Sequence, residues 1–281
     1  MNQQIINLYD EYTHRLLGRF EFLKKLILLT GGAAAAMAVL PLLESNYVQP
    51  IQPADDELFI ETVSYPGIPN PISAYVARLK ENKRYPALIV IHENRGLTPH
   101  IEDVARRAAK AGYLAIAPNA LSALGVAPAT EDEARKLFGD LKAENNLTNF
   151  SNALPYLATR KDYNGSTGCV GFCWGGAMAN NLAVHLPSLK AAVAFYGRQP
   201  LPADVPRIKA ALQFHYAGLD ERVNAGAADY EAALKANKIA FESYLYEGAQ
   251  HAFHNDTSAA RYNQAAATLA WTRTLDFFKK H

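Results

Sequence analysis

Apolar runs and amphipathic segments alternate along the chain from about residue 58 onward. The run Ala-Leu-Ile-Val-Ile-His at 87–92 is nearly continuous, which is typical of a strand buried on both faces of a sheet. Further strand-like runs end just before Cys173 and cover 113–117, 191–195, 210–216 and 240–246. Helical segments lie between and after these runs, at 101–111, 131–159, 175–185, 225–236 and 258–280. This alternation predicts an α/β fold with a mostly parallel central sheet and helices on both faces.

Two strand-like segments precede this alternation, at 58–65 and 72–79. They are separated by a Pro-Gly-Ile-Pro-Asn-Pro segment at 66–71, and prolines and glycines in that density favour a turn. We therefore expect an initial antiparallel hairpin.

The first fifty residues have a different character. From 26 to 43 there are 18 consecutive uncharged residues, preceded by the cations Arg15, Arg19, Lys24 and Lys25. This combination resembles a signal peptide or a short membrane anchor. As a helix the stretch would span about 27 Å, just short of the roughly 30 Å hydrocarbon core of a membrane. The alternative is an Ala-rich helix that packs on its own domain or on a partner subunit, and the sequence leaves both open.

The segment 18–24 resembles a twin-arginine export signal in which Phe20 replaces the second arginine. No Ala-x-Ala cleavage site follows the apolar stretch. A proline-containing linker at 47–56 leads onward, so we divide the chain into an N-terminal apolar helical extension, 1–50, and a globular domain, 51–281. The signal interpretation implies export or inner-membrane association, with membrane contact through 26–43. The packing interpretation implies a cytoplasmic protein.

Composition supports one large folded domain with a modest extension. The 281 residues are 49% hydrophobic and 20% charged, which argues against wholesale disorder or a coiled coil. The net charge of +1 provides no basic field for phosphates, so nucleic acid is not an expected partner. The oligomeric expectation is a monomer or a small homo-oligomer.

The chain has two cysteines, Cys169 and Cys173, at the end of one strand-like run. Four positions along a strand span roughly 13 Å, whereas a disulfide needs Cα atoms within about 7 Å. Two thiols without a nearby second pair of ligands also do not make a structural zinc site. Each cysteine is therefore either a buried apolar residue or a reactive thiol.

The segment Gly171-Phe172-Cys173-Trp174-Gly175 has the form G-x-C-x-G between a strand and a helix. Glycines on both sides permit the tight turn called a nucleophile elbow, which lifts its central residue off the sheet. The thiol of Cys173 would also lie at a helix N-terminus, where the helix dipole favours the thiolate. Cys173 is thus the candidate nucleophile, and Cys169 is expected to be buried in the strand.

An acid and a histidine follow the elbow, each after a separate strand. Asp220 comes just past 210–216, and His251 just past 240–246, so both should lie on the same rim of the sheet as Cys173. Taken singly, Asp220 could cap a turn or pair with Arg222, and one of 8 histidines in a loop is unremarkable. The ordered set of three is what predicts a catalytic triad.

Glu93 follows the strand 87–92 and is a second candidate carboxylate. It could pair with Arg95, or it could hold the proton of the thiol in the resting enzyme and limit oxidation. The backbone N–H of Asn94, in the same loop, and that of Trp174 are the candidate oxyanion-hole donors.

These residues resemble the dienelactone hydrolase family of α/β-hydrolases, also called carboxymethylenebutenolidases, from about residue 58 to the C-terminus. The carriers of the resemblance are His92-Glu93, Gly171-Phe172-Cys173-Trp174-Gly175-Gly176, Phe195-Tyr196-Gly197, Gly218-Leu219-Asp220 and Gly248-Ala249-Gln250-His251-Ala252-Phe253. The resemblance implies Cys173 as nucleophile, His251 as general base, Asp220 as its orienting acid and Glu93 as the carboxylate that governs the charge of the thiol. Enzymes proven on dienelactone have an arginine a few residues after the histidine, whereas 253–256 here read Phe-His-Asn-Asp.

The resulting prediction is a hydrolase of a small ester or lactone that works through a covalent acyl-enzyme and needs no cofactor or metal. Phe172, Tyr196 and Phe253, with Trp174, would line an apolar pocket, although aromatic residues near a sheet rim are more often core. One alternative is a thioesterase or another acyl-transfer enzyme with the same triad. The other is a catalytically silent α/β-hydrolase that serves as a binding or membrane-tethered scaffold.

Overall fold

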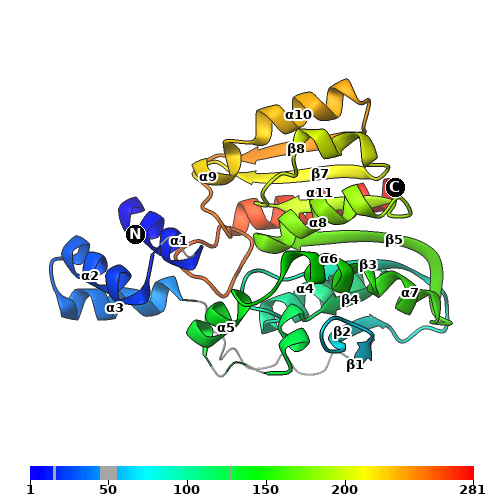
Figure 1. Cartoon of the computed structure of the whole chain (residues 1–281), viewed down its shortest axis with the longest axis horizontal. Helices are drawn as coiled ribbons and strands as arrows, with labels where there is room; N and C mark the ends of the chain where they lie inside the picture. Colours follow the sequence, from blue (N-terminus) through cyan, green and yellow to red (C-terminus); the bar gives the residue numbers. More distant parts are fainter. Residues whose placement is uncertain (15–16, 45–55, 127, 129) are drawn as a thin grey trace.

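A mixed sheet crosses the molecule, in the computed structural model that describes residues 1–14, 17–44, 56–126, 128 and 130–281. Within these residues eight strands are ordered β1-β2-β4-β3-β5-β6-β7-β8 (Figure 1). Their bounds are β1 Leu58–Tyr65, β2 Ile72–Leu79, β3 Tyr85–Ile91, β4 Leu114–Pro118, β5 Tyr163–Phe172, β6 Ala191–Phe195, β7 Ala211–Ala217 and β8 Phe241–Tyr246. The β1–β2 hairpin and the β2–β4 pair are antiparallel, and every pair from β4 to β8 is parallel. The predicted α/β-hydrolase fold class is confirmed.

Helices cover both faces of the sheet because its central strands are apolar on both sides. In β3, Ile89 and Ile91 pack into one cluster, and Leu88 and Val90 pack into the other. The first cluster lies beneath α8 (Trp174–His185) and α10 (Ala227–Ala236), and the second beneath α4 (Pro99–Lys110) and α11 (Gln264–Lys280). Alternate side chains of a strand point to opposite faces, so a continuous apolar run is what two covered faces require.

The predicted helix 131–159 is wrong as a single element. The chain instead forms α5 (Glu131–Phe138), α6 (Ala143–Ser151) and α7 (Ala153–Ala158). Gly139 ends α5, and Pro155 falls where a continuous helix would bring its ring against the carbonyl of Ser151. The helix is accordingly interrupted at Asn152, between α6 and α7.

Other boundaries also follow local signals. Helix α11 begins at Gln264 and not at the predicted 258. The Asn263 side chain accepts a hydrogen bond from the N–H of Ala266 and caps the helix there. A short helix, α9 (Glu221–Asn224), precedes α10. Two 3-10 helices that the sequence pattern did not predict are η1 (Ala120–Leu124) and η2 (Pro202–Arg207).

Within residues 1–14 and 17–44, the described part of the N-terminal region, the chain forms three helices: α1 (Gln3–Thr13), α2 (Arg19–Thr30) and α3 (Ala33–Leu43). They enclose their own apolar cluster, which includes Tyr9, Phe22, Leu26, Leu40 and Leu43. The uncharged stretch 26–43 is divided between α2 and α3, which meet at a bend of 113°. Within the described part of the chain no single helix is long and apolar enough to cross a membrane, whereas α2 and α3 pass that test as a pair. The expected linker at 47–56 and the division at residue 50 lie almost wholly outside the described residues.

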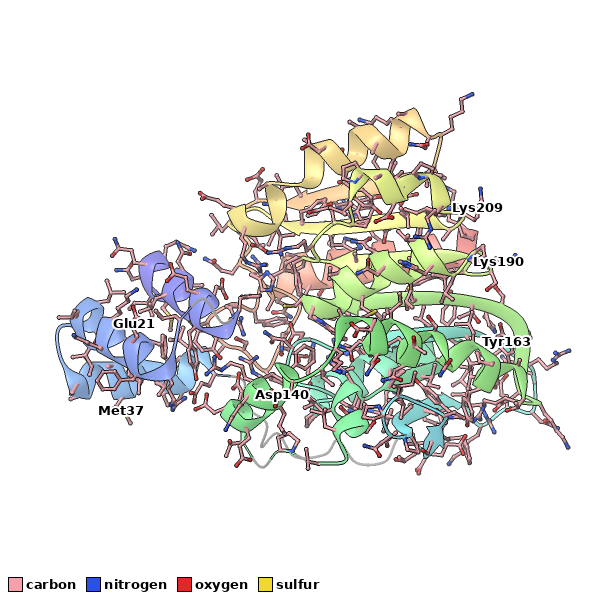
Figure 2. All side chains as sticks on the ribbon, viewed as in Figure 1. Glu21, Met37, Asp140, Tyr163, Lys190 and Lys209 are labelled. Atoms are coloured by element: carbon pink, nitrogen blue, oxygen red, sulfur yellow. The ribbon has the colours of Figure 1, made fainter. Side chains whose placement is uncertain are left out.

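The N-terminal helices lie beside the end of the sheet where the parallel strands finish. Figure 2 shows Tyr163, Lys190 and Lys209, which lie at or just before the starts of β5, β6 and β7, on the opposite side of the molecule from Glu21 and Met37. The carboxyl ends of the strands therefore face α1. Working residues of open α/β sheets collect at this rim.

Candidate active site

The end of β5 and the start of α8 meet at Cys173 in a sharp turn. Cys173 has φ 55° and ψ −113°, a conformation that non-glycine residues rarely adopt. The turn requires small neighbours, because a Cβ on Gly171 would lie 1.9 Å from the carbonyl oxygen of Gly175. A Cβ on Gly175 would lie 2.3 Å from the carbonyl oxygen of Ile91 on the adjacent strand. The G-x-C-x-G segment thus forms the tight strand-to-helix turn that its glycines predict.

Asp220 and His251 are held together at the ends of β7 and β8. One carboxylate oxygen of Asp220, Oδ2, accepts a hydrogen bond of 2.5 Å from His251 Nδ1, and Oδ1 accepts one of 3.3 Å from the N–H of Val223 and caps α9. Asp220 therefore caps α9 with one oxygen and orients His251 with the other. Because Nδ1 of His251 is occupied, its Nε2 is the nitrogen left to face the thiol.

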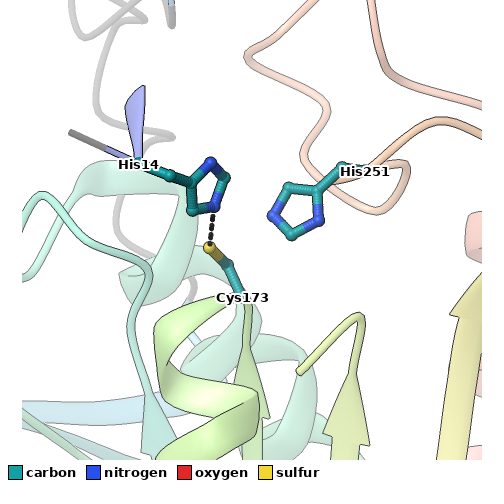
Figure 3. Close-up of side chains that lie close together, drawn as sticks. All are labelled: His14, Cys173 and His251. Atoms are coloured by element: carbon teal, nitrogen blue, oxygen red, sulfur yellow. Dashed lines mark hydrogen bonds between the residues drawn. The ribbon is translucent and has the colours of Figure 1, made fainter. Parts of the chain in front are cut away.

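Cys173 and His251 are neighbours at the rim, although Nε2 of His251 has no hydrogen-bond partner among the described residues. A ring nitrogen of His251 and the Cys173 sulfur lie within 4.8 Å of each other (Figure 3). Burial, the largest single influence, would raise the pKa of the Cys173 thiol, but the charges and hydrogen bonds of His251 and His14 together outweigh burial and lower that pKa to about 6. Burial would conversely lower the pKa of His251, yet Asp220 and Cys173 together raise it well above the ordinary value. The two shifts favour a thiolate–imidazolium pair at neutral pH.

A second imidazole, that of His14, contacts the nucleophile from the N-terminal region. Its Nε2 lies 3.6 Å from Cys173 Sγ and accepts a hydrogen bond of 3.0 Å from Arg222 Nη2, since a guanidinium has only donors. Its Nδ1 donates to the backbone oxygen of Asp10 at 2.7 Å. These partners place a ring proton on Nδ1 and an acceptor at Nε2. Sequence reasoning missed His14, and 159 positions of separation leave no local signal that would have found it.

Helix α1 brings His14 to the sheet rim through specific contacts with the domain. The side-chain amides of Gln3 and Gln250, the residue before His251, exchange hydrogen bonds. Tyr9 donates its hydroxyl to Glu131 at 3.1 Å and lies under the guanidinium of Arg261, which is 5.1 Å from the ring centroid. Burial, with the charge of Glu131, raises the pKa of the Tyr9 hydroxyl. The contacts with α1 span three separate parts of the rim.

A pocket of about 320 Å³ opens over the thiol. Its walls are apolar on one side and carry three arginines, and the residues lining it are Thr13, His14, Asn94, Arg135, Phe138, Cys173, Trp174, Ala177, Tyr196, Arg198, Arg222, Val223 and His251. The arginines come from α5, the loop after β6 and α9. From the sequence, Arg222 is expected only as a possible partner of Asp220, and neither Arg135 nor Arg198 is expected in the pocket.

The predicted pocket aromatics divide between wall and core. Tyr196 and Trp174 line the pocket as expected. Phe172 and Phe253, in contrast, have no exposed surface and belong to the cluster between the sheet, α4 and α11. Phe172 precedes the elbow on β5, and its ring packs 4.8 Å from that of Phe195, so it supports the turn from below.

Glu93 and the two candidate oxyanion-hole residues lie beside the thiol. Glu93 Oε2 accepts a hydrogen bond of 2.7 Å from Asn255, and its Oε1 is buried and has no hydrogen-bond partner among the described residues. Glu93 and Asn94 line a small cavity together with Cys173. Trp174 is the first residue of α8, and the first N–H groups of a helix lack partners within it.

Cys169 differs sharply from Cys173, although both thiols are free. Its side chain is fully buried in β5, and its Sγ lies 3.9 Å from the backbone oxygen of Ala179. Burial raises the pKa of the Cys169 thiol, which keeps it protonated. The structure therefore gives one inert cysteine and one activated cysteine.

Comparison with known proteins identifies similar chains. A family model described as "Dienelactone hydrolase family" matches residues 72–281. A "Putative carboxymethylenebutenolidase" of Saccharolobus solfataricus is 31% identical over 230 residues, which cover 69% of this chain and 89% of that protein. A protein of the same name from Escherichia coli O157:H7 is 32% identical over 247 residues, covering 82% and 90%. The crystal structure titled "Putative Dienelactone Hydrolase" from Klebsiella pneumoniae has a TM-score of 0.71 and 28% identity, covering 80% of this chain and 99% of that one.

Proposed function

The chain belongs to the dienelactone hydrolase family, and from this premise we propose that it cleaves a small ester or lactone through an acyl-enzyme on Cys173. One observation carries the proposal: the hydrogen-bonded pair Asp220–His251 directs an imidazole at the thiol of an elbow cysteine. Nucleophile, base and orienting group are the three parts that covalent acyl transfer requires.

The reaction begins with the thiolate of Cys173. Its sulfur attacks the carbonyl carbon, a C–S bond forms, and the N–H groups of Trp174 and Asn94 hold the oxygen that becomes negative. The C–O bond to the leaving group then breaks, and the His251 imidazolium gives its proton to that oxygen. His251, now neutral, takes a proton from water, which attacks the thioester and releases the acid. The thiolate and imidazolium are thereby restored.

Glu93 has a supporting role in this scheme. Its unpartnered oxygen, Oε1, is buried beside the cavity that contains the thiol. A carboxylate there can accept a hydrogen bond from the thiol in the fraction of substrate-free enzyme in which Cys173 is protonated, and the protonated thiol resists oxidation better than the thiolate does.

The pocket favours a substrate that carries an acidic group. Arg198 and Arg222 line the same wall region as Cys173, and Arg135 lies in the same pocket. Guanidinium groups bind carboxylates with paired hydrogen bonds. The apolar part, which includes Phe138 and Trp174, suits a short hydrocarbon or unsaturated portion of the same molecule.

A substrate panel with the Cys173→Ala variant tests the proposal. The purified chain should hydrolyse p-nitrophenyl esters or lactones, and the variant should lose that activity while it keeps the wild-type circular dichroism spectrum. Acyl thioesters in the same panel test the alternative of a thioesterase. Hydrolysis that survives in Cys173→Ala at the wild-type rate would exclude the triad and favour the silent-scaffold alternative.

A further inference from the structure

Three groups with metal-binding atoms converge at the mouth of the active site. One ring nitrogen each of His14 and His251 and the sulfur of Cys173 all lie within 4.8 Å of one another. The His14 Nε2 to Cys173 Sγ distance is 3.6 Å (Figure 3). In a tetrahedral zinc site, bonds of about 2.3 Å to sulfur and 2.0–2.1 Å to nitrogen separate the ligand atoms by about 3.3–3.7 Å. The His14–Cys173 separation already fits zinc, and the separations to His251 would have to shorten by up to about 1.5 Å.

Nδ1 of each imidazole makes a hydrogen bond of the kind that orients histidine ligands in metal sites. Nδ1 of His251 is bonded to the carboxylate of Asp220 at 2.5 Å, and Nδ1 of His14 to the backbone oxygen of Asp10 at 2.7 Å. Such partners fix the tautomer and turn the other nitrogen toward the metal. Nε2 of His251 is buried and has no hydrogen-bond partner among the described residues. Nε2 is therefore the nitrogen of each ring that is left for a metal, once His251 gives up its Nε2 proton and the hydrogen bond from Arg222 to His14 is broken.

The donor set also matches zinc chemically. Thiolate sulfur and neutral imidazole nitrogen are both zinc ligands, and binding of the ion would release the proton that Cys173 and His251 share. The small cavity that all three residues line also carries two carboxylates, Glu93 and Glu131, and two guanidinium groups, Arg95 and Arg261, so its fixed charges balance. The pocket over the thiol leaves the fourth coordination position open to water.

We propose that His14, Cys173 and His251 form a Zn²⁺ site that the N-terminal region completes, and that bound Zn²⁺ holds the enzyme inactive. Zinc would occupy the sulfur that attacks the carbonyl and the nitrogen that carries the proton, so one ion blocks both. The inhibitory consequence rests on the proposed function, whereas the binding does not.

The guanidinium of Arg222 should weaken zinc binding. Its Nη2 donates to the same Nε2 of His14 that would bind zinc. A cation at this distance repels a divalent ion, and its hydrogen bond must break before the metal binds. Removal of the guanidinium should therefore strengthen zinc binding, and removal of the His14 imidazole should weaken it.

The test uses the full-length, reduced, metal-free protein. Titration calorimetry measures the affinity for Zn²⁺, and Co²⁺ substituted for Zn²⁺ reports thiolate ligation through a sulfur-to-cobalt charge-transfer absorption. The variants are His14→Ala, Cys173→Ala and Arg222→Gln, with His185→Ala as the control because His185 is exposed at the end of α8, outside the cluster. Circular dichroism confirms that each variant is folded.

We expect one zinc ion to bind, with affinity at least about tenfold weaker in His14→Ala, lost in Cys173→Ala, increased in Arg222→Gln and unchanged in His185→Ala. Equal affinity in His14→Ala and the unaltered chain would overturn the proposal, because Cys173 and His251 alone would then hold the ion. Absence of the cobalt–thiolate absorption would overturn it as well.

The inhibitory role has a separate test. If bound Zn²⁺ does not inhibit the Cys173-dependent hydrolysis, the inhibitory site is overturned and the proposed function stays intact. Hydrolysis that persists in Cys173→Ala would overturn the proposed function instead. Zinc binding by the unaltered chain could still be measured in that case.

Discussion

His14 Nε2 lies 3.6 Å from Cys173 Sγ, although 159 positions of the chain separate the two residues. The contact exists because α1 packs on the rim of the sheet and ends with His14 above the elbow. The N-terminal region therefore contributes a side chain to the active site, whatever else its apolar helices do. The contact thus joins the N-terminal helices to the candidate nucleophile, Cys173.

The pH dependence of hydrolysis should be bell-shaped. The pKa of Cys173 is lowered to about 6, so the thiolate protonates and kcat/KM falls as the pH drops through about 6. The pKa of His251 is raised well above its ordinary value, so the imidazolium persists at neutral pH and is lost only in the alkaline range. A profile of kcat/KM against pH measures both limbs. An acid limb near the ordinary thiol pKa would contradict the proposed ion pair.

Asp220→Asn should separate orientation from capping. The amide keeps a side-chain oxygen for the Val223 N–H, and Asn caps helices as well as Asp does, so stability should change little. The variant loses the carboxylate that stabilises the His251 imidazolium, and kcat should fall on the order of 10²–10⁴-fold. Asp220→Ala is the matched comparison, because it should lose the same activity and about 0.5–2 kcal/mol of unfolding free energy in addition. Full activity in Asp220→Asn would show that the carboxylate is not needed.

Alkylation should distinguish the two cysteines. Iodoacetamide should modify Cys173 well before Cys169, because the thiolate of Cys173 faces the pocket and Cys169 is fully buried with a raised pKa. Peptide mass spectrometry over a time course measures both rates in one sample. Similar rates for the two thiols in the native protein are the result that this account does not allow.

The arginines of the pocket should determine substrate charge preference. Arg198→Gln should raise KM about tenfold or more for an ester that carries a free carboxylate, since a hydrogen bond to a charged group is worth about 1.5–3 kcal/mol. KM for the uncharged methyl ester of the same substrate should change little. A parallel loss for both substrates would indicate a general disturbance of the pocket and not recognition of an acid.

The elbow should tolerate no side chain at its glycines. Gly171→Ala would bring a Cβ to 1.9 Å from the Gly175 oxygen, and we expect a loss of about 2 kcal/mol or more of unfolding free energy. Gly18→Ala is the control, because nothing lies within 4 Å of its Cβ position. Denaturant unfolding of both variants measures the difference, and equal stabilities would argue against the close packing described here.

The sequence predicted what depends on local pattern. The parallel strands are evident from the sequence because runs such as 87–92 are apolar on both faces, and Cys173, Asp220 and His251 stand out because each lies within five residues after the end of a strand. The polar helical pattern over 131–159 does not reveal the ends of α5 at Gly139 and of α6 at Asn152.

Contacts between distant segments could not be predicted in this way. Phe253 was placed in the pocket by its nearness to His251 in sequence, yet its ring packs into the core below. The contact of His14 with the thiol depends on how α1 docks against the sheet rim, through residues such as Gln250 and Glu131. No spacing rule within the chain encodes that docking.

The most direct test of the central claim is intact-mass spectrometry of the protein mixed with a slowly hydrolysed ester and quenched within a turnover. We predict a mass increase of one acyl group in the unaltered protein and in Cys169→Ala, assigned to Cys173 by peptide mapping, and no increase in Cys173→Ala. An acyl group on any other residue, or hydrolysis by Cys173→Ala at the wild-type rate, would contradict the assignment of Cys173 as the nucleophile.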